Sequence, residues 1–177
     1  ILADKGIIGG DRELLSEKEY LGLASFFGQD DRLRRDLIAN AQGHYVVYRR
    51  SFFKPGYILR GALLIKSEDE DSYLSTREIY AADKHNHDWS RVGYFIGREG
   101  GRYVMVSRKE GINDPQIVYL KEAMRKNRPP NKQEFDNIEG IITDWQQSEF
   151  YGTPIFIVKV NNPLSNKEIC DLLPSQV

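Results

Sequence analysis

Two histidines separated by one residue, His85-Asn86-His87, form the most metal-like spacing in the chain. Alternate residues of a β-strand point to the same side, so this pair could share one metal ion. A catalytic zinc site needs three protein ligands, and His44 is the only other histidine. A metal-dependent enzyme that uses His85 and His87 is therefore kept as an alternative, and we expect no metal and no cofactor.

Nucleophilic catalysis has little support in the sequence. Cys170, the single cysteine, has no histidine near it in the chain, and no Gly-x-Ser-x-Gly motif is present. The segment Gly97 to Gly101 is rich in glycine, but it lies in an expected hairpin and not between a strand and a helix, as a phosphate-binding loop would. The sequence favours a non-enzymatic function over an enzyme.

Cations alternate with aromatic rings between residues 48 and 60. Such a pattern suits a ligand that offers both phosphates and stacking surfaces, such as a nucleotide or single-stranded nucleic acid. However, the 25 Lys and Arg residues nearly cancel the 26 Asp and Glu residues, and nucleic-acid-binding domains usually carry a basic excess. Nucleic acid is therefore not favoured as a partner. The residues concerned are Tyr48, Arg49, Arg50, Phe52, Phe53, Lys54, Tyr57 and Arg60.

The elements that would position these residues begin with two short helices. Ser16 followed by Glu19 predicts a capping box, and apolar residues recur at helical spacing until Gly28. A second helix is predicted to start near Asp30 or Asp31 and to end before Gly43.

After Gly43 the apolar period becomes that of β-strands. Short polar connections separate the predicted strands, and no helix of crossover length lies between them, which indicates an antiparallel sheet. Eight such strands can close into a barrel and so leave no unpaired edge. The predicted strands are 43–52, 57–67, 72–82, 91–98, 102–109, 116–123, 138–147 and 153–161.

The fold class is thus mainly β: an eight-stranded antiparallel barrel with N-terminal helices and a short C-terminal helix. Ser165 and Glu168 form a second capping box that predicts this last helix, which Pro174 ends. We expect residues 1–42 to form a linker and the N-terminal helices, and residues 43–177 to form the barrel and the C-terminal helix, as one structural unit. Because the chain begins at Ile1, we expect it to be part of a longer protein with an upstream domain.

Tyrosines and mid-strand glycines suggest that the barrel is hollow. Tyrosine brings a hydroxyl group that a dry core does not need, and glycine in a strand marks a bend or a close approach. Half-buried tyrosines and bulged glycines in a filled barrel would explain the same pattern. We predict that a small ligand is lined by Tyr45, Tyr48, Arg49, Arg60, Tyr94 and Tyr103.

The order of elements resembles the lipocalin-like (calycin) barrels over residues 31–173. That family has a short N-terminal helix, a first strand opening with Gly-x-Trp, an up-and-down barrel and a C-terminal helix; here the strand opens with Gly43-His44-Tyr45. The plan is also similar to ligand-sensing domains that follow helix-turn-helix domains in bacterial regulators. Either resemblance implies a barrel that binds a small, partly apolar molecule and takes part in regulation.

The main prediction is a sensor domain whose partners are a small molecule and the upstream domain. A protein-protein interaction or assembly domain with a filled core, including a homo-oligomer, is the first alternative. No apolar run approaches the roughly 18 residues of a membrane span, so we expect no membrane partner. The lone cysteine fits a reducing compartment, and we expect a cytoplasmic location.

Overall fold

The computed structural model describes residues 16–51, 56–68, 72–80, 89–109, 115–122, 137–146 and 149–160. Two helices, α1 (Glu17–Phe26) and α2 (Asp31–Ala41), precede the strands. The strands are β1 (Gly43–Arg50), β2 (Ile58–Glu68), β3 (Tyr73–Tyr80), β4 (Trp89–Arg98), β5 (Arg102–Lys109), β6 (Pro115–Glu122), β7 (Asn137–Gln146) and β8 (Glu149–Val160).

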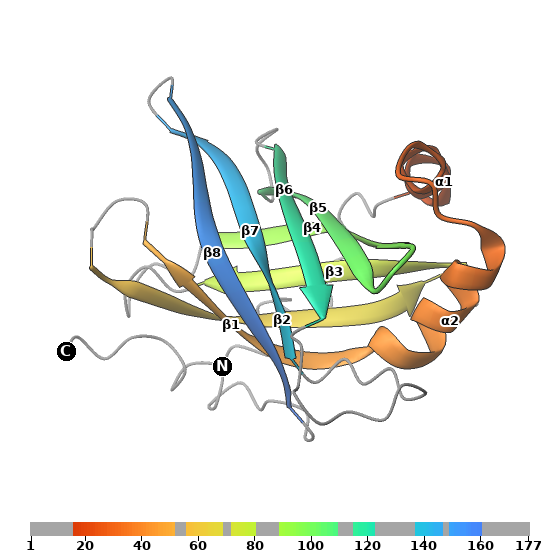
Figure 1. Cartoon of the computed structure of the whole chain (residues 1–177), viewed down its shortest axis with the longest axis horizontal. Helices are drawn as coiled ribbons and strands as arrows, with labels where there is room; N and C mark the ends of the chain where they lie inside the picture. Colours follow the sequence, from red (N-terminus) through yellow and green to blue (C-terminus); the bar gives the residue numbers. More distant parts are fainter. Residues whose placement is uncertain are drawn as a thin grey trace, which may run out of the picture.

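The eight strands form a closed barrel in which each strand pairs with its neighbour in the sequence. Every pairing is antiparallel, and β8 closes the barrel by pairing with β1. Figure 1 shows β7 and β8 crossing steeply over the layer that β2, β3 and β4 make, as expected when strands tilt around a barrel axis. The predicted mainly β fold, the eight-stranded antiparallel barrel and the two N-terminal helices are confirmed.

Predicted and observed strand boundaries differ most at β8. The sequence places the start of the last strand at residue 153, whereas β8 begins at Glu149, because β7 pairs with it beyond Gly152. Similarly, Trp89 and Ser90 extend β4 by pairing with β3. The predicted C-terminal helix and the 1–15 linker lie outside the described residues, and the proposed division at residue 42 stays a prediction.

Helix α1 begins as its sequence predicts. The Ser16 side chain accepts a hydrogen bond from the Glu19 amide at 3.2 Å, and the Glu19 carboxylate accepts one from the Ser16 amide. The helix ends at Phe26, and Gly28 adopts a positive φ of 76°, which is accessible to glycine without strain. Tyr20 and Ala24 of α1 are buried against the outer surface of the sheet.

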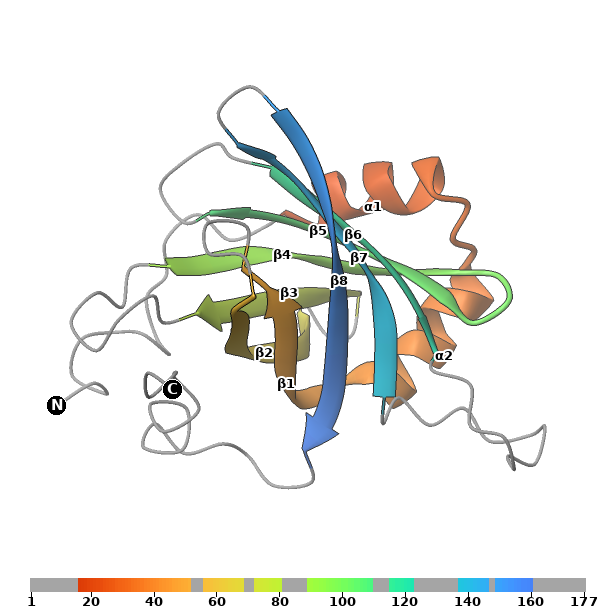
Figure 2. The same ribbon diagram turned by 60° about the vertical axis from the view of Figure 1, so that its left-hand side comes forward.

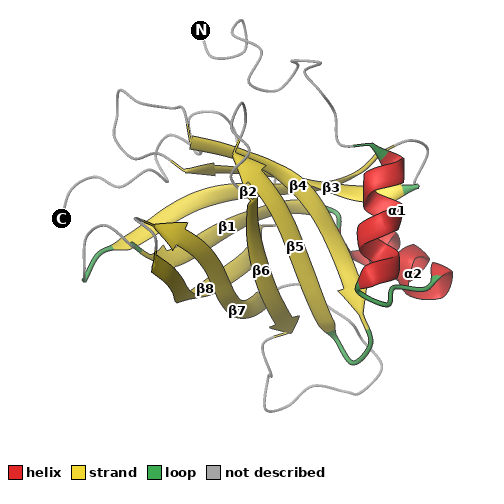
Figure 3. Cartoon of the chain, turned by 90° about the horizontal axis from the view of Figure 1, so that it is seen from above, coloured by secondary structure: helices red, strands yellow, loops and turns green. Residues whose placement is uncertain are grey.

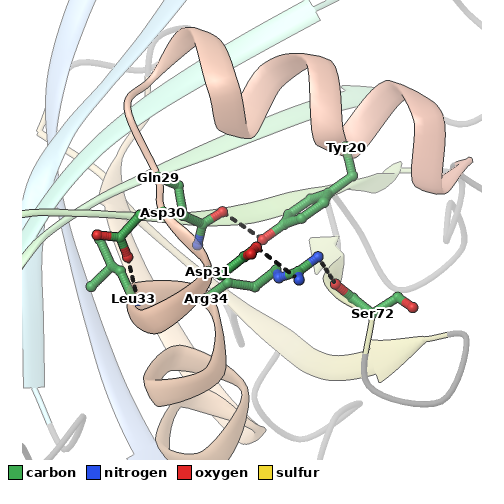
Figure 4. Close-up of polar contacts among 7 residues, drawn as sticks. All are labelled: Tyr20, Gln29, Asp30, Asp31, Leu33, Arg34 and Ser72. Atoms are coloured by element: carbon green, nitrogen blue, oxygen red, sulfur yellow. Dashed lines mark hydrogen bonds and ion pairs between the residues drawn. The ribbon is translucent and has the colours of Figure 1, made fainter.

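Helix α2 follows α1 after four residues, and its first turn is held by several polar contacts (Figure 4). Asp30 is the N-cap, and its carboxylate accepts a hydrogen bond from the Leu33 amide at 2.7 Å. Arg34 forms an ion pair with Asp31 at 2.9 Å and donates to the Ser72 carbonyl oxygen at 3.4 Å. These contacts tie the start of α2 to the residue that precedes β3.

The two helices are also tied to each other. The Tyr20 hydroxyl donates a hydrogen bond to Gln29 Oε1 at 2.6 Å, as Figure 4 shows. Burial raises the pKa of Tyr20 to about 12, so the phenol stays neutral and keeps its proton for this bond. Figure 3 shows both helices at the same end of the barrel.

The buried residues form two clusters on opposite sides of the sheet. The larger fills the barrel interior and includes Leu37, Ile38 and Ala41 of α2. The smaller lies outside the barrel, where α1 covers Tyr73, Tyr94 and Ile96. Helix α2 therefore closes one end of the lumen, which we call the helix end, and α1 covers the outer surface of β3 and β4. The opposite end, where β1 ends and β2 begins, we call the loop end.

Candidate functional site

The inward-facing residues divide the lumen into two halves of different chemistry. The half near the helix end is apolar and tightly packed: the rings of Phe95 and Tyr103 stack at 5.4 Å between centroids, and both are almost fully buried. We call this part the apolar half. It contains Tyr45, Val47, Leu63, Ile65, Leu74, Phe95, Tyr103, Met105, Leu120, Ile138 and Ile157.

The half near the loop end is lined by polar and charged side chains. The most buried charged group is Glu78, which is 1% exposed, and the two arginines Arg49 and Arg91 are 6% and 7% exposed. We call this part the polar half. Its members come from six strands and are Arg49, Thr76, Glu78, Arg91, Ser107, Gln116 and Thr153.

The strand register brings these polar residues together. Glu78 of β3 lies directly opposite Arg91 of β4, and Ser107 of β5 lies opposite Gln116 of β6. Arg91 Nε donates a hydrogen bond to Ser107 Oγ at 3.4 Å. Directly opposite residues in an antiparallel pair hold their Cβ atoms about 5 Å apart, so the four residues form one continuous polar wall.

Burying such groups is costly unless other groups compensate for the lost water. Removing a charge from water costs several kcal/mol, and an unpaired buried hydroxyl about 1–3 kcal/mol. Thr76 Oγ1 is buried on this wall and has no hydrogen-bond partner in the structure. An apolar residue would be less costly there if the barrel were only a scaffold, so the polar half is the candidate site.

The described charges of this half are mainly positive. Arg49 and Arg91 face inward, and Lys109, half-buried at the end of β5, alternates onto the same side as Ser107. Glu78 is the only carboxylate among the buried residues of the described chain. The arrangement could bind a compact anion, because arginine presents several donors in a fixed fork that matches a carboxylate or phosphate.

Three of the six predicted ligand residues lie inside the barrel, but in different halves. Arg49 is in the polar half. Tyr45 and Tyr103 are in the apolar half, and their hydroxyls donate to the Ala41 carbonyl oxygen at 2.5 Å and to Glu122 Oε1 at 2.9 Å. The two tyrosine hydroxyls therefore fasten the helix end of the barrel.

The other three lie outside the lumen. Tyr48 and Arg60 face each other on the outer surface of β1 and β2, and Tyr48 is partly exposed. Tyr94 lies beneath α1, where its hydroxyl donates to Glu19 Oε2 at 2.8 Å, and burial together with this contact raises its pKa. The structure thus does not bring the six residues into one lining, and their role in ligand binding stays a prediction.

Sequence reasoning missed most of the polar half. It named Arg49 but none of Thr76, Glu78, Arg91, Ser107, Gln116 and Thr153. These residues could have been found from the strand register, because every second residue of a strand, and the residue paired with it, points to the same side of the sheet. Tyr45 faces the lumen and pairs with Leu63, which therefore faces the lumen too. Leu63 in turn pairs with Glu78, so Glu78 also belongs to the lumen.

We also searched the described residues for a metal site and for a helix that could span a membrane. Within the described ranges, no three residues of the His, Cys, Asp or Glu types are grouped so that they could hold a metal ion. His85 and His87 lie outside those ranges. No helix of the described chain is long and apolar enough to cross a membrane.

Comparison with known proteins gives no relative: no family model matches the chain, and neither the curated proteins nor the solved structures contain a match.

Proposed function

We propose that this barrel is a non-enzymatic binding module that holds a compact, negatively charged small molecule in the polar half of its lumen. The supporting observation is the set of seven buried polar residues at the loop end, with two arginines among them. The binding groups are Arg49 and Arg91, with hydrogen bonds from Thr76, Ser107 and Gln116.

The filled apolar half limits the size of the ligand. Phe95, Met105 and Ile138 are each fully buried there, and α2 packs over that end. A long hydrocarbon chain would have to displace these side chains, which costs several kcal/mol for a close-packed interior. The ligand is therefore compact, and a lipocalin-like barrel of this kind would differ from one that holds a long lipid.

A sensor role follows from the same proposal. The polar wall belongs to the same strands that support both helices: β3 and β4 carry Glu78 and Arg91 and contact α2, and β4 also contacts α1. If a ligand displaces this wall, the displacement would be transmitted to the helices, and through them to an upstream domain of the same protein. This route supports a regulatory function in preference to simple storage.

The test is a set of small ring compounds matched in size. Benzoate and phenyl phosphate are the charged probes, and benzamide and benzyl alcohol are the neutral ones. A ligand that binds the native state at 100 times its dissociation constant stabilises the protein by about 2.7 kcal/mol, so charged probes should raise the thermal midpoint and neutral ones should not.

Two variants locate the binding. Arg49→Met should abolish the stabilisation, because it keeps the length of the side chain and removes the charge. Arg60→Met is the matched control, since Arg60 lies on the outer surface. If no probe changes the midpoint, or if both variants respond as the wild type does, the proposal is wrong.

A further inference from the structure

A second surface of the molecule, outside the barrel, is apolar and open. The outer surfaces of β6, β7, β8, β1 and β2 form a groove of about 400 Å³, which we call the outer groove. Side chains at its floor are well exposed: Ile58 by 64%, Ile141 by 53% and Phe156 by 40%. In Figure 2, β7 and β8 lie at the front, whereas α1 and α2 lie behind them.

The register shows that the groove is continuous. One row of outward residues runs directly across five strands, from β6 through β7, β8 and β1 to β2; in order it is Lys121, Glu139, Phe156, Tyr48 and Arg60. Tyr119 opposite Ile141, and Arg50 opposite Ile58, extend it by a second row. Outward residues of an antiparallel sheet are usually polar where they meet water, so the exposed apolar side chains of this groove, Phe156, Ile141 and Ile58, need an explanation.

The same molecule shows how such a surface is covered. On the other side of the barrel, the outward residues Tyr94 and Ile96 of β4 are buried by α1. That helix contributes Tyr20, Leu23 and Ala24, and its C-cap residue Phe27 extends the same face. Its first turn is acidic, and Glu19 accepts a hydrogen bond from Tyr94. A short amphipathic helix with acidic residues therefore fits the outer sheet surface of this fold.

Charge is distributed unevenly around the outer groove. At the β6–β7 side, Lys121 and Glu139 neutralise each other in an ion pair of 3.0 Å. At the β1–β2 side, Arg50 is exposed, and no carboxylate of the described residues lines the groove there. A partner is thus expected to place its carboxylates over β1 and β2 and its apolar side chains over Phe156 and Tyr48.

The dimensions match a helix of about three and a half turns. Five strands spaced about 4.8 Å apart give a row about 19 Å long, which a helix of about 13 residues would cover at 1.5 Å per residue. Single-stranded nucleic acid fits less well, because the chain has a net charge of −1 and Glu139 lies within the row. We propose that the outer groove docks an amphipathic, acidic helix of a protein partner.

The test uses two fluorescent peptides that differ only in charge. The first is a synthetic helix of about 13 residues with Leu or Phe at positions i, i+3, i+4 and i+7 and glutamates on one flank. The second carries lysines instead of the glutamates. Fluorescence anisotropy with the full chain should show that the acidic peptide binds at least about tenfold more tightly, because the charges at one edge are complementary.

Variants then assign the binding to the groove. Phe156→Ser and, as an independent change, Ile58→Ser should each weaken the acidic peptide by about tenfold or more, as expected for a buried anchor at an interface. Arg50→Glu should reverse the preference between the peptides. Phe26→Ser is the matched control, because Phe26 is 82% exposed at the end of α1, away from the groove.

Four results would overturn the proposal. These are equal binding of both peptides, no binding of either, binding that survives both Phe156→Ser and Ile58→Ser, and loss of binding in Phe26→Ser. A decathymidine oligonucleotide that binds and is lost in Phe156→Ser would assign the groove to nucleic acid. A concentration-dependent dimer that disappears in Phe156→Ser would assign it to a second copy of the chain. All of these outcomes are independent of ligand binding in the lumen.

Discussion

The apolar and polar halves of the lumen are built from the same strands but respond to different demands. In the apolar half, buried side chains contact one another and α2 closes the end, so packing explains every residue. In the polar half, charged groups are equally buried, yet a close-packed core does not require them. The contrast indicates that the first half holds the barrel together, and it supports the proposal that the second half binds a ligand.

The largest effect is expected from a cavity in the apolar half. Phe95→Ala removes a ring that is fully buried and stacked on Tyr103. The free energy of unfolding should fall by about 3–5 kcal/mol, measured by urea titration. Phe156→Ala is the control, because its partly exposed ring should contribute much less to folding. A similar loss in both variants would remove the distinction between the lumen and the outer groove.

A smaller loss is expected where two strands approach each other beside the polar half. A Cβ at Gly93 would lie 2.1 Å from the Val106 carbonyl oxygen, which is backbone and cannot move aside easily. Gly93→Ala should therefore destabilise the barrel by about 1–3 kcal/mol. Gly22→Ala is the matched control in α1, where no atom lies within 4 Å, and it should stabilise by up to about 1 kcal/mol. Equal effects would show that the approach is not tight.

Helix α2, which closes the apolar half, can be destabilised without changing any residue of the lumen. Asp30→Ala removes the carboxylate that caps the Leu33 amide and should cost about 1 kcal/mol. Asp30→Asn should restore most of the loss, because asparagine caps helices equally well. Because the proposed sensor role couples the polar half to the helices, and such coupling is reciprocal, ligand binding should weaken in Asp30→Ala and recover in Asp30→Asn. Unchanged binding in Asp30→Ala would contradict the sensor role.

The smallest change in stability is expected in the polar half itself. Thr76→Val keeps the shape of the side chain and removes a buried hydroxyl that has no hydrogen-bond partner. Stability should stay the same or rise by up to about 1 kcal/mol, since no bond is lost and a desolvated group disappears. The charged probe should nevertheless bind more weakly. A clear loss of stability would mean that the hydroxyl supports the fold and not a ligand.

Much of the fold could be predicted from local sequence signals. The capping residues Ser16 and Asp30 determine where the two helices begin, since each provides an acceptor for an otherwise unsatisfied backbone amide. Strand ends were harder to predict: the last strand was predicted to start at residue 153, although β7 pairs with the chain on both sides of Gly152. Pairing between strands compensates for the weak preference of a single glycine.

Mid-strand glycines mark close approaches in this barrel, which is one of the two causes that the sequence suggested, beside a bend. A Cβ at Gly93 would meet the backbone of β5, and one at Gly97 would meet Leu33 of α2 at 3.1 Å. Both glycines therefore permit close approach of neighbouring elements. The polar half rests on Arg49, Glu78 and Arg91, which no local signal distinguishes from charges on the surface.

By itself, the sequence determined the number of strands, their antiparallel order and the start of each described helix, because these depend on neighbours along the chain. Only the tertiary structure decided which alternate residues face the lumen, since a strand has two equivalent sides until its partners and the helices cover one of them. That choice placed Arg49 inside and Tyr48 outside, although they are adjacent in β1.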